Sequence, residues 1–152
     1  MPFCHLRLTA PKPTDPAYPN TLKTLGDHLR KKRLDLGLLQ CDVGEKLGVT
    51  ESTIWNWEKN ATTPAIRLIP RIIRFLGYNP YPTGQSLPEK LTSARKALGL
   101  SQRKLAHMLS VDQSTLAGWE TGRHRPTRNT LKGVEEFLSG LSPSYASHNK
   151  LG

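Results

Sequence analysis

The fold of this chain is decided by residues 40–58, QCDVGEKLGVTESTIWNWE. Apolar side chains recur there at helical spacing, which predicts two short helices. Small residues, Gly44 and Gly48, stand where the helices would approach closely and where the chain would turn between them. Residues 102–120, QRKLAHMLSVDQSTLAGWE, show the same pattern with Ala106 and Ser110 at the small positions. The chain therefore contains two copies of a two-helix hairpin.

The duplication extends well beyond the hairpin. Leu25–Gly77 aligns without a gap on Leu87–Ser139, about 62 residues further on. Identical pairs include Leu29/Leu91, Arg33/Arg95, Leu36/Leu98, Gly37/Gly99, Gln40/Gln102, Leu47/Leu109, Val49/Val111, Ser52/Ser114, Thr53/Thr115, Trp57/Trp119, Glu58/Glu120, Pro64/Pro126 and Phe75/Phe137. Two copies are too few for a solenoid, so we interpret them as two small domains in tandem, called repeat one and repeat two.

Prolines, glycines and changes in composition along the sequence predict the domain boundaries. We expect an extended, proline-rich arm over residues 1–20, domain one over 21–77, a linker over 78–85, domain two over 86–139 and a flexible tail over 140–152. Two prolines and a glycine in the linker would break any helix there. No segment alternates with a period of two, so the expected fold class is all-α, with four to five helices in each domain.

Capping residues predict the ends of these helices. Thr24-x-x-Asp27 and Ser86-x-x-Glu89 are capping boxes for the first helix of each repeat. Gly37 and Gly99 should end those helices in the left-handed conformation. The third helix should begin behind Thr50 or Asp112 and end near Asn60 or Gly122. The last helix should run from Pro70 to Leu76 in repeat one and from Thr127 to Leu138 in repeat two.

The composition points to a polyanion and excludes several other classes. The formal net charge is +10 and the isoelectric point is about 10.0, as expected of a nucleic-acid binder. Cys4 and Cys41 are far apart and suit a reducing cytoplasm better than a disulfide scaffold. We expect no metal and no cofactor, since no ligand set has the spacing of a metal site. The absence of a long apolar run predicts no membrane association and no secretory signal.

Two segments in each repeat resemble the Cro and phage-repressor family, also called the XRE type. They are Arg-x-x-x-Gly-Leu-x-Gln and Leu-Gly-Val-Thr-x-Ser-Thr-Ile-x-x-Trp-Glu in repeat one, with close equivalents in repeat two, followed by a proline and a helix ending in Phe-Leu. The resemblance covers about two thirds of the chain. It implies lambda-repressor-like helix-turn-helix domains whose ligand is double-stranded DNA, with the second helix of the hairpin in the major groove.

The resemblance also implies which residues would contact bases. In the family, the cap, the first residues of the third helix and the residue before the tryptophan reach base edges. Here those positions are Thr50, Glu51, Ser52 and Asn56 in repeat one, and Asp112, Gln113, Ser114 and Gly118 in repeat two. Helical geometry leaves Trp55 and Lys59 exposed as well, if Ile54 and Trp57 face the core. Trp55 could contact a thymine methyl group, the other domain or a second copy of the chain.

Other residues are expected to contact phosphate or to stabilise the fold. The family uses the glutamine that begins the second helix on the DNA backbone, which points to Gln40 and Gln102, although either could be a local cap. Phosphate contacts are also expected from Arg103, Arg123 and Arg125. By the same resemblance, Arg33 with Glu58 and Arg95 with Glu120 form structural pairs that tie the first helix to the third.

The sequence thus favours a sequence-specific DNA-binding transcriptional regulator of prokaryotic or phage and mobile-element type, located in the cytoplasm with the nucleoid. The alternative is an antitoxin-like or adaptor protein in which one repeat binds a protein partner or dimerises. Catalysis is not expected, since no nucleophile motif, phosphate loop or carboxylate pair is present. Two repeats in direct order favour a direct rather than a palindromic DNA site unless they pack with pseudo-twofold symmetry, and the sequence leaves this open.

Overall fold

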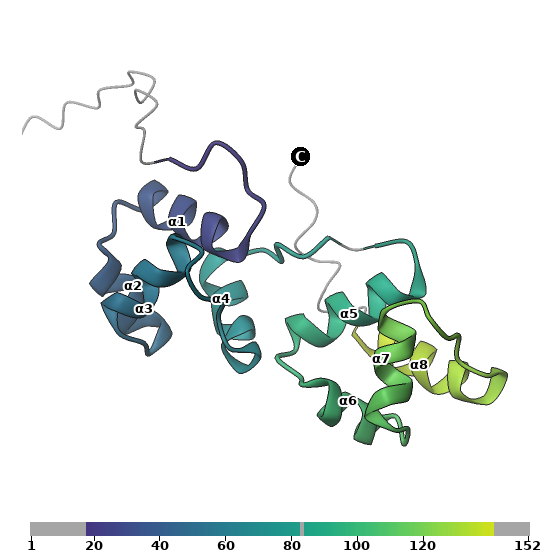
Figure 1. Cartoon of the computed structure of the whole chain (residues 1–152). Helices are drawn as coiled ribbons and strands as arrows, with labels where there is room; N and C mark the ends of the chain where they lie inside the picture. Colours follow the sequence, from purple (N-terminus) through teal and green to yellow (C-terminus); the bar gives the residue numbers. More distant parts are fainter. Residues whose placement is uncertain (1–17, 83, 142–152) are drawn as a thin grey trace, which may run out of the picture.

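The computed structural model describes residues 18–82 and 84–141, and all of its regular elements are helices (Figure 1). Nearly all of the expected arm and tail, with Cys4, lies outside these residues. Repeat one contains α1 (Leu25–Asp35), α2 (Gln40–Leu47), α3 (Glu51–Glu58), a short 3-10 helix η1 (Ile66–Leu68) and α4 (Ile69–Leu76). Repeat two contains α5 (Leu87–Ala97), α6 (Gln102–Met108), α7 (Gln113–Glu120) and α8 (Arg128–Gly140). The all-α fold class is confirmed.

The helix ends follow the capping residues of the sequence. Both capping boxes form: Thr24 with Asp27 before α1, and Ser86 with Glu89 before α5. Five glycines in the described residues have a positive φ: Gly37, Gly48, Gly77, Gly99 and Gly122. Among the described non-glycine residues, only Asn60 and Ser110 have a positive φ. Ser110 has a φ of 56° where repeat one has Gly48 at 68°. The equivalent turns of the two repeats therefore have the same conformation, with glycine in one and serine in the other. Asp112 precedes α7 without a side-chain cap hydrogen bond, and α8 runs two residues past the expected Leu138.

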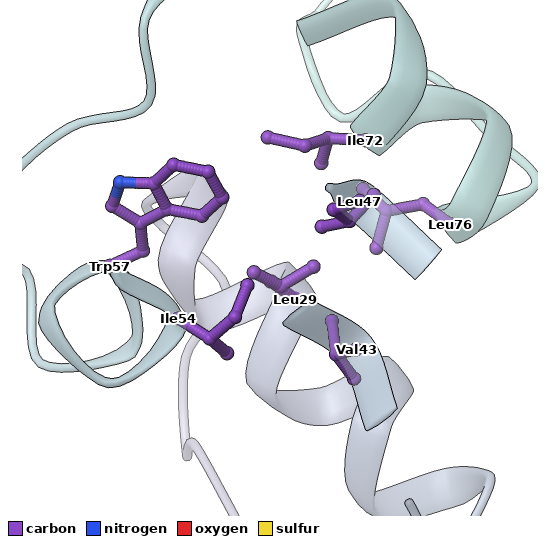
Figure 2. Packing of buried hydrophobic residues seen from close by; sticks show 7 residues of the cluster. All are labelled: Leu29, Val43, Leu47, Ile54, Trp57, Ile72 and Leu76. Atoms are coloured by element: carbon purple, nitrogen blue, oxygen red, sulfur yellow. The ribbon is translucent and has the colours of Figure 1, made fainter. Parts of the chain in front are cut away.

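Each repeat has its own hydrophobic core. Figure 2 shows the core of repeat one, where side chains from all four α-helices converge: Leu29, Val43, Leu47, Ile54, Trp57, Ile72 and Leu76. Repeat two buries Leu91, Leu105, Ala106, Leu116, Trp119 and Val134. Most of these residues occupy equivalent places in the alignment, because the same helix faces were duplicated with the chain. In both repeats the second and third helices pack closely on each other, which holds the third helix at the surface.

The linker packs on the helices on either side of it. Tyr78 Oη lies 2.7 Å from His28 Nδ1 of α1, and the Lys96 ammonium of α5 lies 5.3 Å from the centre of the Tyr81 ring. Burial of the Tyr81 ring raises the pKa of its hydroxyl. The sequence predicted only a segment that breaks helices. The aromatic side chains give this segment a defined place against both repeats.

Candidate nucleic-acid interface

The third helix of repeat one presents polar residues on a surface held by the core. Ile54 and Trp57 are buried and anchor α3 from below, while Glu51, Ser52 and Lys59 are exposed. Thr50 caps the helix, and its hydroxyl accepts a hydrogen bond from the Thr53 amide. The start of α3 is therefore a rigid platform for side chains.

A shallow hollow lies on this surface, between the starts of α2 and α3. Its lining brings together five of the residues expected from the sequence: Gln40, Glu51, Ser52, Trp55 and Asn56. The Trp55 side chain is 49% exposed, although an indole is usually buried. An exposed indole beside amide, hydroxyl and carboxylate groups can offer both an apolar contact and hydrogen bonds to the edge of a base.

Behind the hollow, three side chains from different helices bind one another. Arg33 donates from Nε to Glu58 Oε1 at 2.6 Å and from Nη2 to Oε2 at 2.8 Å. The Gln40 side-chain amide donates to the same Oε2 at 2.9 Å. The Glu58 side chain is only 3% exposed, and the hydrogen bond that Arg33 donates to Glu58 raises the pKa of Arg33. This cluster joins α1, α2 and α3 and orients Gln40 toward the interior of the protein.

Repeat two contains the same cluster. Arg95 donates to Glu120 from Nε at 2.5 Å and from Nη2 at 3.1 Å, and the Gln102 amide donates to Glu120 Oε2 at 2.7 Å. Each arginine also donates to the backbone carbonyl five residues later, on Leu38 or Leu100. The duplicated arginine, glutamine and glutamate thus hold each third helix in place. In the free protein the side-chain N–H groups of both glutamines point at glutamate.

The third helix of repeat two differs from that of repeat one where Asn56 stands. Its equivalent, Gly118, is buried, and a Cβ added there would lie 2.7 Å from Cδ2 of His124. The exposed His124 ring therefore covers the position from which a side chain at 118 would project. At the start of α7, Asp112, Gln113 and Ser114 remain exposed. The sequence places His124 with Arg123 and Arg125 in the basic cluster expected to contact phosphate, and the structure also places its ring beside Gly118.

Basic side chains are concentrated around the hairpin of repeat two. Arg103 and Lys104 are exposed at the start of α6, where repeat one has Cys41 and Asp42. Arg123, His124 and Arg125 are exposed after α7, where repeat one has Ala61, Thr62 and Thr63. Repeat two thus presents more positive charge beside its third helix.

A family model for the helix-turn-helix matches the chain twice, over residues 29–81 and 91–145, which is more than half of its length. The chain belongs to the helix-turn-helix family. The family is the XRE type, in two tandem copies. The hairpins α2–α3 and α6–α7 lie within the two matched segments.

Two curated relatives carry regulator names. The chain is 43% identical over 49 residues to an uncharacterized HTH-type transcriptional regulator of Methanothermobacter thermautotrophicus, covering 32% of this chain and 71% of that protein. It is 35% identical over 51 residues to the HTH-type transcriptional activator BcrR of Enterococcus faecalis, covering 34% of this chain and 25% of that protein. No solved structure gives a significant match.

The family match and the names of these relatives support a DNA-binding transcriptional regulator, although the chain spans only about a quarter of the length of BcrR. None of the helices described between residues 18 and 141 is long and apolar enough to cross a membrane. The same residues contain no group of three or more His, Cys, Asp or Glu side chains that could hold a metal ion.

Proposed function

We propose that this protein is a prokaryotic or phage-type regulator that binds double-stranded DNA through both repeats, with different work in each. Repeat one supplies most of the base reading, and repeat two supplies most of the grip on phosphate. The observation that carries the proposal is the contrast between the hollow beside Asn56 and the covered, side-chain-free position at Gly118. Association with the nucleoid follows from DNA as the ligand.

In repeat one, the residues around the hollow match the groups of a base edge. The Asn56 amide can pair with adenine through N6 and N7, and Glu51 can accept from cytosine N4. Glu51 also stands in the first turn of α3, where a carboxylate stabilises the helix dipole. Trp55 can pack on a thymine methyl group. Thr50 and Ser52 lie beside these groups, and Lys59 lies beyond the C-terminal end of the helix for a phosphate.

In repeat two, the exposed cations suit the DNA backbone. Arg103, Arg123 and Arg125 flank α7 on both sides, and arginine binds phosphate oxygens with a planar fork of donors. Base contacts in this repeat are left to Asp112, Gln113 and Ser114 at the exposed start of the helix. Gln113 is the residue there that can pair with adenine on two atoms.

Selection from a random duplex pool with the full chain, at about 150 mM salt, tests this proposal because phosphate contacts alone enrich no sequence. Wild type should enrich a motif with two elements. Asn56→Ala should erase the base preference of one element, and Gln113→Ala should weaken the other. The pair Arg123→Ala/Arg125→Ala should leave the motif intact and reduce the slope of log affinity against log salt by about one per lost phosphate contact.

The outcomes separate the two roles. If Arg123→Ala/Arg125→Ala lost sequence preference and Asn56→Ala kept it, repeat two and not repeat one would supply most of the base contacts. A pool without any enriched motif would contradict sequence-specific binding. It would favour the second candidate, an antitoxin-like or adaptor protein.

The exposed side chains of Leu36 and Leu39, close in sequence in repeat one, favour that second candidate, since exposed apolar groups suit a protein partner or a second copy. Leu36 is 52% and Leu39 is 65% exposed beside the turn between α1 and α2. Binding through these groups would show little dependence on salt, in contrast to DNA.

A further inference from the structure

The two repeats touch through helices that are not equivalent to each other. α4, the last helix of repeat one, packs on α5, the first helix of repeat two (Figure 1). The contact is close at the end of α5, where a Cβ added to Gly99 would lie 2.8 Å from Pro70 Cγ and 3.1 Å from the Ile66 carbonyl oxygen. Glycine at 99 therefore allows α4 to approach.

Buried apolar side chains that belong to neither core lie on these two helices. Ile69 on α4 is 5% exposed, and Ala94 and Ala97 on α5 are 8% and 9% exposed. None of the three is a member of the core cluster of its own repeat. Since α4 and α5 are in contact, we attribute their burial to this interface.

The residues that differ between the repeats fit the same interface from both sides. On α5, Ser93, Ala94 and Ala97 stand where α1 of repeat one has Lys31, Lys32 and Asp35. Ile66, Pro70 and Ile73 stand at or on α4 where α8 of repeat two has Arg128, Lys132 and Glu135. Small and apolar residues occur on the two faces that meet, and charged residues occupy the equivalent faces of α1 and α8. Composition and packing thus agree that α4–α5 is a built interface.

The contact between non-equivalent surfaces excludes one symmetry. In a twofold arrangement, contact of α4 with α5 would require the reciprocal contact of α8 with α1. Within the described part of the chain, α1 and α8 form no comparable contact, and they lie at opposite ends of the molecule in Figure 1. The interface is therefore heterologous. Two recognition helices related in this way cannot read the two halves of a palindrome, since a palindrome has twofold symmetry.

The linker supports a fixed arrangement. Tyr78 is joined to α1 through His28, and the Tyr81 ring lies on Lys96 of α5. Both ends of the connection are thus attached to the repeat that they adjoin, and the interface lies between them. The separation of α3 and α7 is therefore set by these contacts and not by the length of the linker.

We propose that the α4–α5 interface holds α3 and α7 at one separation, so that a single chain binds a DNA site of two elements in the same orientation at one spacing. This rests on the proposed function, because it describes the DNA that the two repeats would read together. Simultaneous engagement of both repeats is available only when the DNA geometry matches that of the protein.

The test uses duplexes built from the motif enriched out of the random pool. One series changes the distance between the two elements by single base pairs, and one duplex inverts the second element. Wild type should bind one spacing best and lose about tenfold or more on either side and on inversion, because only one repeat can then engage its element. Equal affinity across the spacing series, or tighter binding to the inverted element, would overturn the inference.

Two variants remove the interface with residues that the other repeat already carries. Ser93→Lys/Ala94→Lys/Ala97→Asp gives α5 the residues of α1, and Ile66→Arg/Pro70→Lys gives repeat one the residues of repeat two. Both should bind the whole spacing series within about threefold, since a flexible connection relaxes the spacing requirement. The matched control, Lys31→Ser/Lys32→Ala/Asp35→Ala, makes the reverse exchange on α1, outside the α4–α5 interface, and should keep the wild-type preference. A spacing preference that survives in both interface variants would overturn the inference.

Backbone ¹⁵N relaxation of the DNA-free protein keeps this result apart from the proposed function. Wild type should show one tumbling time for both repeats, and the interface variants should show two shorter ones. Independent tumbling in wild type would overturn the fixed separation even if DNA binding is specific. Common tumbling without an enriched DNA motif would refute sequence-specific binding and the two-element site, leaving only the rigid arrangement.

Discussion

At the scale of single residues, the recognition surfaces of the two repeats diverged while the residues beneath them stayed the same. Arg33, Glu58 and Gln40 have identical equivalents in repeat two, and both sets form the same hydrogen bonds. On the third helix, the partly exposed Asn56 is replaced by the buried Gly118, over which the His124 ring lies. A residue of the Arg–Gln–Glu cluster cannot be replaced alone without leaving its buried partner unpaired, whereas a residue on the outer face of the third helix can be replaced without affecting the fold.

The buried pair gives a stability prediction. Arg95→Met should destabilise repeat two by about 3–5 kcal/mol, because it leaves the 5% exposed side chain of Glu120 without its partner charge. The comparison is Lys31→Met, which removes the Lys31–Asp35 pair with side chains 44% and 41% exposed and should cost less than about 1 kcal/mol. Urea unfolding followed by circular dichroism measures both. Equal losses in the two variants would show that Glu120 is not desolvated.

At the scale of helices and turns, local signals determined most of what formed. The capping boxes begin α1 and α5, and glycines at 37 and 99 follow the same two helices in the left-handed conformation. These signals act through neighbouring backbone groups, so they are legible in a linear sequence. The absence of a side chain at Gly99 also leaves space for Pro70, and this role depends on a helix from the other repeat.

A matched pair of glycine substitutions separates these two roles. Gly37 and Gly99 have φ of 66° and 68°, so alanine should cost about 1–2 kcal/mol at either from the backbone alone. An added Cβ at Gly37 meets nothing within 4 Å, whereas at Gly99 it meets Pro70. We therefore expect Gly99→Ala to be the more destabilising of the two in thermal unfolding, and to loosen the common tumbling of the repeats. The interface would be in doubt if the two variants behaved alike.

The capping box of α5 predicts a dependence on pH. Hydrogen bonds from the side chain and backbone of Ser86 lower the pKa of Glu89 in the folded protein. A carboxyl whose pKa is lower when folded adds stability above its unfolded pKa, and this stability is lost as the pH falls from the unfolded pKa through the lower folded pKa. Glu89→Gln should therefore flatten the loss of stability on acidification, measured by unfolding from pH 6 to pH 3. An unchanged profile would mean that the carboxylate does not cap the helix.

At the scale of the whole molecule, the heterologous interface gives a reason for the charges on the equivalent faces of α1 and α8. A contact that joins the end of one unit to the start of the next can be repeated without limit unless the outer faces block it. Lys31, Lys32 and Asp35 on α1 and Arg128, Lys132 and Glu135 on α8 occupy those outer faces. We interpret these charges as a barrier to head-to-tail assembly of chains.

The barrier can be removed and its effect measured. A chain carrying both Lys31→Ser/Lys32→Ala/Asp35→Ala and Arg128→Ile/Lys132→Ala/Glu135→Ile should form species of increasing mass with concentration in sedimentation velocity. Each triple variant alone should sediment like wild type, and an equimolar mixture of the two should form a complex of one chain of each. If the combined variant keeps the wild-type mass, the outer faces lack the shape needed to repeat the contact.

The sequence by itself determined the repeat, the all-helical fold, the helix ends and the residues that gather around α3, because each depends on neighbours within about 20 positions or on a duplicated pattern. The sequence also shows that Ser93, Ala94 and Ala97 replace Lys31, Lys32 and Asp35 in the second copy. The sequence does not show which surface packs against these smaller residues. Only the tertiary structure placed α4 against α5, His124 over Gly118, and the two tyrosines of the linker on opposite repeats. These contacts join residues whose proximity depends on how finished helices pack, which no local pattern encodes.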